Sequence, residues 1–390
     1  MSIKKAILNI CRILVGLLFI FSGFIKANDP LGFSYKLDEY FSVFHTAWHG
    51  FPAAMLTPIS AYISMIICVF EMFVGICLLL GVFKQFTAWM LLIMIVFFSF
   101  LTFYSAYFNK VTDCGCFGDA IHLTPWQSFS KDMILLVLII PIFAWRRFLE
   151  PIFGDRGSRS VAFVALLVSL LFTMFAFYYL PPIDFRPYAV GNDIVQQMQK
   201  PAGPPDSVIM TFVYMDKKSG KKFELSTDQI SHMDSVKSAE LAKNDSFITR
   251  NDNVIRKAKQ APIHDFSISF HDSDVTKGFL SENGYRLMIV QYDIEKSTVR
   301  FQPELNKVAK QLIKDGKVKI WALSGSSAAL NDAYRKNNLV PYPFYSADVT
   351  MLKTIIRSNP GLVLFYNNVV LQQWPATALP SAEKIYSYMK

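Results

Sequence analysis

The apolar residues of this chain are concentrated in its first half, where they form five long runs. The runs cover residues 6–25, 59–80, 86–108, 129–145 and 161–180. Each approaches the length of roughly 20 residues that a helix needs to cross the hydrocarbon core of a bilayer. The pattern therefore predicts an all-α bundle of membrane-spanning helices over residues 1 to about 180.

The fourth run is the weakest of the five. Lys131 and Asp132 lie near its start, and Pro141 lies near its end. A buried helix of a soluble protein would give a similar pattern, but the spacing of this run and its apolar neighbours favour a span. The first run is typical of an uncleaved signal anchor, because it is long and no small-residue cleavage site precedes the continuation Lys26-Ala-Asn-Asp-Pro30.

The distribution of basic residues predicts the orientation of this bundle, because cytoplasmic loops carry an excess of Lys and Arg. In a five-span arrangement one side receives Lys4, Lys5, Arg12, Lys84, Arg146, Arg147, Arg156 and Arg159. We therefore expect a protein of the bacterial inner (plasma) membrane with a cytoplasmic N-terminus. Loops 26–58 and 109–130, and the chain after Leu180, would then be periplasmic.

The second half of the chain predicts a separate exterior part. Pro181-Pro-Ile-Asp-Phe-Arg-Pro187 is a stiff exit from the last span, because proline fixes φ and ends helices. We expect four segments: a bundle (1–147); a basic loop, fifth span and exit (148–190); a hairpin with a polar helical insertion (191–261); and an exterior domain (262–390). Within the third segment, the hairpin is expected at 208–214 and 222–225 and the helix at 237–259.

The exterior domain alternates strand-like and helix-like segments. Strands are expected at 286–292, 318–323, 362–366 and 369–373, and helices at 301–314, 326–336, 348–357 and from residue 381. A βαβ order followed by a β-hairpin and a helix predicts an α/β domain with a central sheet covered by helices.

Composition agrees with a membrane protein. Mean hydropathy is +0.30 and 52% of the residues are hydrophobic, which is too apolar for an ordinary soluble chain of this length. Membrane lipid is therefore an expected partner. The net charge of +9 indicates no nucleic-acid partner, because topology explains part of it and a solvated exterior domain explains the rest.

Candidate chemistry is concentrated in Asp113-Cys-Gly-Cys-Phe-Gly-Asp119, between the third and fourth runs. Redox chemistry needs accessible thiols that can reach each other, and only Cys114 and Cys116 are placed in this way. The other cysteines, Cys11, Cys68 and Cys77, lie inside apolar runs and are expected to be small buried hydrophobes. We therefore take Cys114 and Cys116 as a candidate redox pair.

A disulfide between Cys114 and Cys116 would close a very small ring, whose strain would make it a good oxidant. Gly115 permits the tight backbone, and Gly118 is expected to allow close approach by another chain. Asp113 and Asp119 are expected to raise the thiol pKa values by like-charge repulsion.

Two other interpretations of the same segment stay open. A static bridge or two idle thiols is one, although a structural bridge over so short a loop gains little entropy. A metal site formed with His122 and Asp119 is the other, and it lacks the second cysteine pair of a typical zinc site. No metal and no covalently bound cofactor is expected.

Glu71 lies well inside the second run, where a carboxylate is costly and is by default a functional candidate. We expect its partner to be Arg12, on the inner half of the bundle, while Lys26 lies at the outer end of the first span. A structural ion pair and a role in proton or quinone chemistry both remain open for Glu71.

Three separated segments resemble the DoxX/MauE family of membrane proteins. They are Cys11-Arg-Ile-Leu-Val-Gly-Leu-Leu-Phe-Ile-Phe-Ser-Gly-Phe-Ile-Lys26, Glu71-Met-Phe-Val-Gly-Ile-Cys-Leu-Leu-Leu-Gly81 and Asp113-Cys-Gly-Cys-Phe-Gly118, the last typical of the MauE-like branch. The resemblance covers about residues 1–147. It implies a four-helix bundle, here with an additional fifth span, and thiol–disulfide or quinone chemistry. MauE itself is implicated in maturing a disulfide-rich methylamine dehydrogenase subunit.

The exterior domain resembles a thioredoxin-like fold. Asn359-Pro360-Gly361, before Leu362-Val-Leu-Phe365, lies where that fold carries its cis-proline. The active-site cysteines would follow Tyr292, but this chain has Asp293-Ile-Glu-Lys-Ser297 there, and no cysteine follows Cys116. The resemblance therefore implies a domain that binds a partner or a peptide and performs no dithiol exchange itself.

Two functions from different classes follow. The first is an inner-membrane thiol–disulfide oxidoreductase, in which Cys114 and Cys116 exchange with a thiol or disulfide of an exterior protein and electrons pass to or from a quinone. The second is a non-catalytic membrane scaffold whose thioredoxin-like domain docks an exterior partner. The cysteine pair favours the first, and the absence of cysteine from the exterior domain favours the second.

Overall fold

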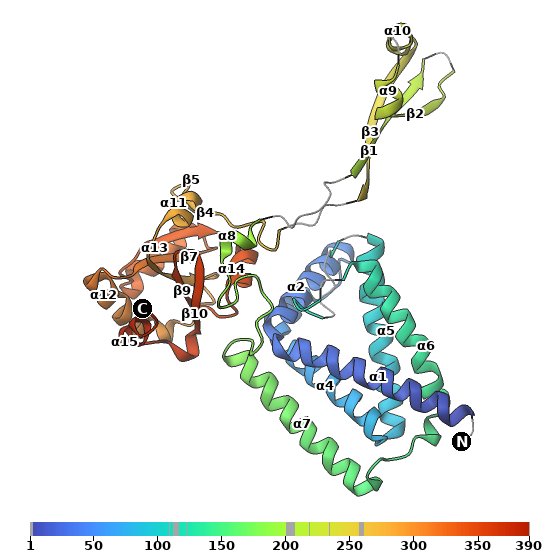
Figure 1. Cartoon of the computed structure of the whole chain (residues 1–390), viewed down its shortest axis with the longest axis vertical. Helices are drawn as coiled ribbons and strands as arrows, with labels where there is room; N and C mark the ends of the chain where they lie inside the picture. Colours follow the sequence, from blue (N-terminus) through green and yellow to red (C-terminus); the bar gives the residue numbers. More distant parts are fainter. Residues whose placement is uncertain are drawn as a thin grey trace. The chain divides into compact units, whose positions relative to one another are not determined.

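The computed structural model describes residues 3–108, 110–111, 117–121, 123–199, 207–217, 219–233, 235–256 and 261–389 (Figure 1). The chain forms two units. One combines Met1–Ile194 with Phe266–Lys390, so that the helical bundle and the C-terminal α/β domain belong to a single unit. The other is Val195–Asp265.

Five helical segments of the bundle are long and apolar enough to cross a membrane, as the sequence predicts. They are α1 (Ile3–Asn28), the segment Ala53–Leu80 that ends in α4 (Ser60–Leu80), α5 (Lys84–Phe108), α6 (Pro125–Ala144) and α7 (Gly154–Tyr178). The weakly predicted fourth span is among them. A short 3-10 helix, η2 (Arg146–Phe148), separates α6 from α7.

Residues 26–58, for which no helix is predicted from the sequence, are mostly helical. They contain α2 (Pro30–Ala47), α3 (Ala53–Leu56) and the 3-10 helix η1 (Thr57–Ile59). The Asp29 carboxylate accepts a hydrogen bond from the Gly32 amide and Pro30 occupies the first turn, which together start α2. Phe33, Leu37 and Phe44 then bury one side of this helix.

Small residues let α1 and α4 pack closely and antiparallel. Gly16 lies against Leu79, whereas Gly23, further along α1, lies against Met72, which comes earlier on α4. A Cβ at Gly23 would come within 2.6 Å of the Met72 side chain, so the contact requires glycine there. This pairing fixes which residues of the two helices lie at the same level.

The α/β domain is built on a seven-stranded sheet in the order β10-β9-β6-β7-β8-β4-β5. β6, β7 and β8 are parallel, whereas β9 runs antiparallel to β6 and forms a hairpin with β10. The strands are β4 (Ile268–Phe270), β5 (Ser273–Asp274), β6 (Tyr285–Gln291), β7 (Lys319–Ser324), β8 (Phe344–Ala347), β9 (Gly361–Tyr366) and β10 (Val369–Pro375).

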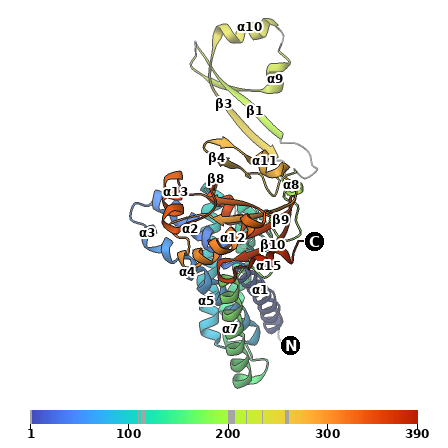
Figure 2. The ribbon, with the colours of Figure 1, turned by 90° about the vertical axis from the view of Figure 1, so that its left-hand side faces the viewer.

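Helices cover both faces of this sheet (Figures 1 and 2). Leu287 and Ile289 of β6 join the core formed with α12 and α15, whereas Phe279 of α11 packs on Trp321 and Phe365. The helices are α11 (Thr276–Ser281), η3 (Val299–Phe301), α12 (Gln302–Asp315), α13 (Ala328–Asn338), α14 (Val349–Ile355), η4 (Ala376–Ala378) and α15 (Ala382–Tyr386). The Asn359–Pro360 peptide bond is cis, as expected.

The unit Val195–Asp265 contains the expected hairpin, formed by β1 (Ser207–Asp216) and β2 (Lys222–Ser226). The helix expected at 237–259 is wrong in its second half. α10 (Ser235–Asn244) ends early, and β3 (Asp245–Arg256) pairs antiparallel with β1. Phe247, Ile248 and Thr249 are residue types that favour strands, and the backbone of the long strand β1 supplies hydrogen-bonding partners for them. The short helices α8 (Ile194–Gln197) and α9 (Thr227–Ser231) complete this part of the chain.

Candidate functional site

The Cys114–Cys116 pair, with Asp113 and Gly115, lies outside the described residues, which stop at Val111 and resume at Phe117. Both flanking residues are buried in the bundle. Val111 is fully buried beside Tyr104, and its carbonyl accepts a hydrogen bond from the Ser105 hydroxyl. The sequence thus places the two candidate thiols between two residues that are fixed by packing.

The C-terminal flank of the pair rests on the last turns of α1. The Phe117 ring lies 5.6 Å from the Phe21 ring, and the Lys131 ammonium lies 5.2 Å from the Phe117 centroid. Gly118 has φ of +50°, a left-handed conformation that favours glycine, and a Cβ added there would lie 3.6 Å from the Ile25 side chain. The structure thus gives a conformational reason for Gly118, whereas close approach by another chain stays a prediction.

Asp119, which follows, is held by an arginine from the α/β domain. Arg357 Nη2 lies 2.9 Å from Asp119 Oδ2, and Arg357 Nε lies 2.9 Å from Asp29 Oδ2. The Arg357 side chain is only 7% exposed. Burial alone lowers the pKa of Arg357, but Asp29 and Asp119 outweigh it and raise that pKa above its usual value. We call residues 109–124, which join α5 to α6 and include Cys114 and Cys116, the cysteine connection. One guanidinium therefore joins the end of α1, the cysteine connection and the α/β domain.

Two tyrosines extend this contact. Tyr35 Oη of α2 lies 3.3 Å from the Oη of Tyr292, the residue after β6, and the Lys353 ammonium lies 4.4 Å from the Tyr35 ring centroid. Burial raises the pKa of both phenols and lowers the pKa of Lys353. The face of the α/β domain that holds Tyr292 and Arg357 thus packs against the chain's own bundle.

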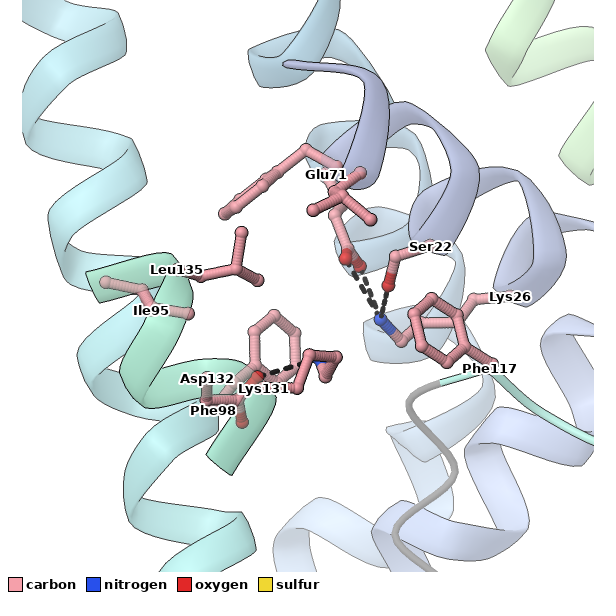
Figure 3. A pocket seen from close by; sticks show the side chains of 11 residues that line it. Ser22, Lys26, Glu71, Ile95, Phe98, Phe117, Lys131, Asp132 and Leu135 are labelled. Atoms are coloured by element: carbon pink, nitrogen blue, oxygen red, sulfur yellow. Dashed lines mark hydrogen bonds and ion pairs between the residues drawn. The ribbon is translucent and has the colours of Figure 1, made fainter. Parts of the chain in front are cut away.

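Glu71 is paired with Lys26 and not with Arg12, so the expected partner is wrong. Lys26 Nζ lies 2.7 and 3.0 Å from the two Glu71 oxygens and donates to Ser22 Oγ at 2.8 Å (Figure 3). Both residues are 3% exposed. The Lys26 ammonium also lies 4.7 Å from the Phe98 ring centroid.

Arg12 is too far along α1 to reach Glu71. Fourteen residues separate it from Lys26, which is about 21 Å on an α-helix. It donates to the carbonyl oxygens of Leu78 and Leu79, at the C-terminus of α4, and of Glu150, at 2.9, 2.5 and 3.1 Å. The carbonyls of Leu78 and Leu79 belong to the last turn of α4, where few partners remain inside the helix, so Arg12 has a capping role there.

A second charged pair faces Lys26 and Glu71 across a pocket. Lys131 Nζ lies 2.7 Å from Asp132 Oδ1, and the Thr102 hydroxyl donates to Asp132 Oδ2 at 2.9 Å. Asp132 is 1% exposed. Residues of α1, α4, α5 and α6 line this pocket together with Phe117, the residue after Cys116 (Figure 3). In the sequence, Cys116 therefore directly precedes a residue that lines a pocket with two ion pairs, of which Lys26–Glu71 is fully buried and Lys131–Asp132 has a partly exposed lysine.

The remaining candidates contribute less to a site. Within the described residues no group of three or more His, Cys, Asp or Glu side chains could hold a metal ion, and His122 lies outside those residues. Cys11, Cys68 and Cys77 are buried free thiols, as expected.

Sequence reasoning missed Arg357, Tyr35 and the role of Asp132. An arginine near the end of a helix has the same local pattern whether it is solvated or buried in a contact. Asp132 did carry a signal, because a carboxylate within an apolar run is a functional candidate in its own right.

Comparison with known proteins agrees with the bundle. Residues 4–145 match the family of the methylamine utilisation protein MauE. The match covers the helices from α1 to α6 and confirms the MauE resemblance of the three sequence segments. α7 and the α/β domain lie beyond it.

Protein TlpB of Flavobacterium psychrophilum is a relative that is 26% identical over 213 residues. The alignment covers 51% of this chain and 53% of TlpB. The chain thus spans about half the length of this relative.

Proposed function

We propose that this MauE-like protein is a membrane thiol–disulfide oxidoreductase whose Cys114 and Cys116 exchange electrons with thiols of an exterior protein. The observation that carries the proposal is Cys114-Gly115-Cys116 itself, two thiols one residue apart between α5 and α6 of a MauE-like bundle. The buried free thiols Cys11, Cys68 and Cys77 offer no comparable pair.

The exchange has two steps. A substrate thiolate attacks one sulfur of the Cys114–Cys116 disulfide, which breaks that bond and forms a mixed disulfide. A second substrate thiol then loses its proton and attacks the mixed disulfide, which releases an oxidised substrate and leaves two cysteine thiols on the protein. Two electrons and two protons have moved from the substrate to the protein. The reverse sequence reduces a substrate disulfide.

Turnover needs a two-electron partner for the reduced pair. A membrane quinone is the proposed class, because it takes up two electrons and two protons within the bilayer. The pocket beneath Phe117 does not fit a quinone as it stands, because the Lys26 ammonium is already bound by Glu71 and Ser22 and Asp132 is bound by Lys131 and Thr102. We therefore assign no residue to quinone binding.

The α/β domain is proposed to be a thioredoxin-like domain without redox cysteines. Its support is the unit β6–α12–β7 followed by α14, β9, β10 and α15, with the sheet order β7-β6-β9-β10 and antiparallel β9. We place it and the cysteine connection in the periplasm. A scaffold that only docks an exterior protein is the second candidate, favoured by the absence of any cysteine after Cys116.

Thiol trapping in cells separates the two candidates. In a background with Cys11, Cys68 and Cys77 changed to Ala, a mass-tagged maleimide should detect both the reduced and the oxidised state of the pair. Cys114→Ser and Cys116→Ser should each accumulate a mixed disulfide with an exterior protein, because the remaining thiol has no neighbour to resolve it.

Cys68→Ser in the otherwise unchanged protein is the matched control, because this thiol is fully buried, and it should trap nothing. A pair that stays fully oxidised under every growth condition, together with single mutants that complement fully, would exclude the oxidoreductase and leave the scaffold.

A further inference from the structure

Arg357 lies between two carboxylates of the bundle, and one of them belongs to the cysteine connection. Its Nη2 contacts Asp119 at 2.9 Å, and its Nε contacts both Asp29 oxygens at 2.9 and 3.2 Å. The Tyr35 ring centroid lies 5.5 Å from the guanidinium carbon. Each partner comes from a different part of the chain: the end of α1, α2, and the exit of the cysteine connection.

The arrangement is shaped around a guanidinium. A Cβ on Gly32 would lie 2.9 Å from Arg357 Nη2, so the first turn of α2 leaves space for this side chain only because residue 32 is glycine. Lysine has the same charge but a single ammonium, which cannot span two carboxylates in fixed directions. A solvent-exposed arginine would need neither the space nor the two partners.

We propose that Arg357 is a positioning residue for the Cys114–Cys116 pair, because it fixes Asp119, three residues after Cys116, and offsets one of the two negative charges of Asp29 and Asp119. This inference rests on the proposed thiol–disulfide exchange. The Cα atoms of residues 116 and 119 are at most about 10 Å apart along the chain. At that range an uncompensated carboxylate disfavours the thiolate. Arg357 is thus a link by which the α/β domain, which has no cysteine, acts on the reactive pair.

The proposal predicts a series ordered by the charge of the cluster Asp29–Arg357–Asp119. That charge is −1 in the wild type, −2 in Arg357→Gln, and zero in Asp29→Asn and Asp119→Asn. The double variant Arg357→Gln with Asp119→Asn returns it to −1. The pH at which Cys116 becomes half-reactive should follow the same order: highest in Arg357→Gln, lower in the wild type and the double variant, and lowest in the two Asn variants.

The measurement uses reduced, purified full-length protein in which Cys116 is the single thiol, with Cys114→Ser and with Ala at residues 11, 68 and 77. The rate of iodoacetamide alkylation is followed against pH. Arg357→Gln should raise the midpoint by about 0.5 pH unit, the size expected for one charge at about 10 Å in a partly solvated setting. At 1 M salt, where screening acts over about 3 Å, the differences should shrink.

The other charged groups near the connection are the same in every variant. Among the described residues they include the pairs Lys26–Glu71 and Lys131–Asp132, Lys353 of α14 with its charged neighbours Asp38, Asp293 and Lys296, and Lys110. Asp113 and His122 belong to the connection itself. Arg300→Gln is the matched control, because Arg300 is an exposed arginine of the same domain, and it should leave the midpoint unchanged.

An Arg357→Gln midpoint equal to the wild type would overturn the proposal. So would a double variant that keeps the full shift, because the effect would then not pass through Asp119. If Arg357→Gln does not fold, Asp29→Asn decides: a lower midpoint supports the proposal, and an unchanged one overturns it. Alkylation needs no biological partner, so this series can succeed or fail independently of the trapping experiment in cells.

Discussion

Glu71 and Lys26 neutralise each other at a depth in the bundle where a single charge would be very costly. The antiparallel packing of α1 and α4 places Gly23 beside Met72, so the Lys26 side chain reaches Glu71 by extending back along α1 past Ser22. A pair of this kind is poor evidence for stability, because two apolar residues often serve equally well. Its place beneath Phe117 is the reason to test it for function.

The first prediction separates structure from function at this pair. Glu71→Gln and Lys26→Met should each lower the free energy of unfolding by about 3–5 kcal/mol, because each leaves one buried group without its partner. The double variant should recover most of that loss. Thermal unfolding in detergent measures stability, and thiol trapping of Cys114 and Cys116 measures activity in the same proteins.

Two results of this double-mutant comparison distinguish the interpretations. A double variant that is stable but no longer cycles its cysteines assigns the pair to the chemistry, and one that is stable and active assigns it to packing. Wild-type stability and activity for Glu71→Gln alone would contradict both interpretations. Glu150→Gln is the control, since it breaks the exposed ion pair with Lys5 and should change neither readout.

At the scale of elements, α2 shows how one residue can serve a helix and a domain contact together. Asp29 caps the helix through the Gly32 amide and also binds Arg357. Asp29→Asn should keep the cap, because asparagine is as good an N-cap residue as aspartate, whereas Asp29→Ala should lose both. We expect the alanine variant to be less stable than the asparagine variant by about 1 kcal/mol.

Thermal unfolding of the two Asp29 variants side by side measures this difference. Ser327→Ala, which removes the N-cap of α13 inside the α/β domain, is the comparison for a cap without a contact to the bundle. Equal stability of the two Asp29 variants would mean that the cap adds nothing to α2.

The elements with a strong local pattern could be predicted from the sequence. β6, β7 and β9 were expected because each is a short apolar run bounded by turn residues, and α12 because its buried residues recur at helical spacing. α2 and β3 were missed because their local sequence patterns are weak. α2 follows a helix directly with only Asp29 between them, and β3 becomes a strand only when it pairs with β1.

The partners of the candidate residues were less accessible than the residues themselves. Glu71 was a candidate from its apolar surroundings, but the choice between Lys26 and Arg12 depends on how far α1 slides along α4, which is set by Gly16 and Gly23. Arg357 and Asp119 are 238 residues apart. The periodicity of the sequence cannot predict such a contact, because it forms only when the folded bundle and the folded α/β domain pack together.

At the scale of the whole molecule, two sets of contacts mark the opposite ends of the bundle. Lys5 pairs with Glu150, which brings the start of α1 and the α6–α7 connection to one end. Asp29, Asp119 and Arg357 bring the end of α1, the cysteine connection and the α/β domain together at the other. If all five candidate helices cross a membrane, the N-terminus and the α/β domain lie on opposite sides of it.

The last prediction concerns which end of the bundle faces the cytoplasm. The basic residues Arg146, Arg147, Arg156 and Arg159 lie with Lys5 at the first end, so we expect that end to be cytoplasmic. A reporter active only in the cytoplasm should be silent when fused after Lys390 and active when fused after Arg147. A reporter active only in the periplasm should give the reverse. Activity of the cytoplasmic reporter after Lys390 would contradict the proposed function directly, because it would place Cys114 and Cys116 in a compartment that keeps thiols reduced.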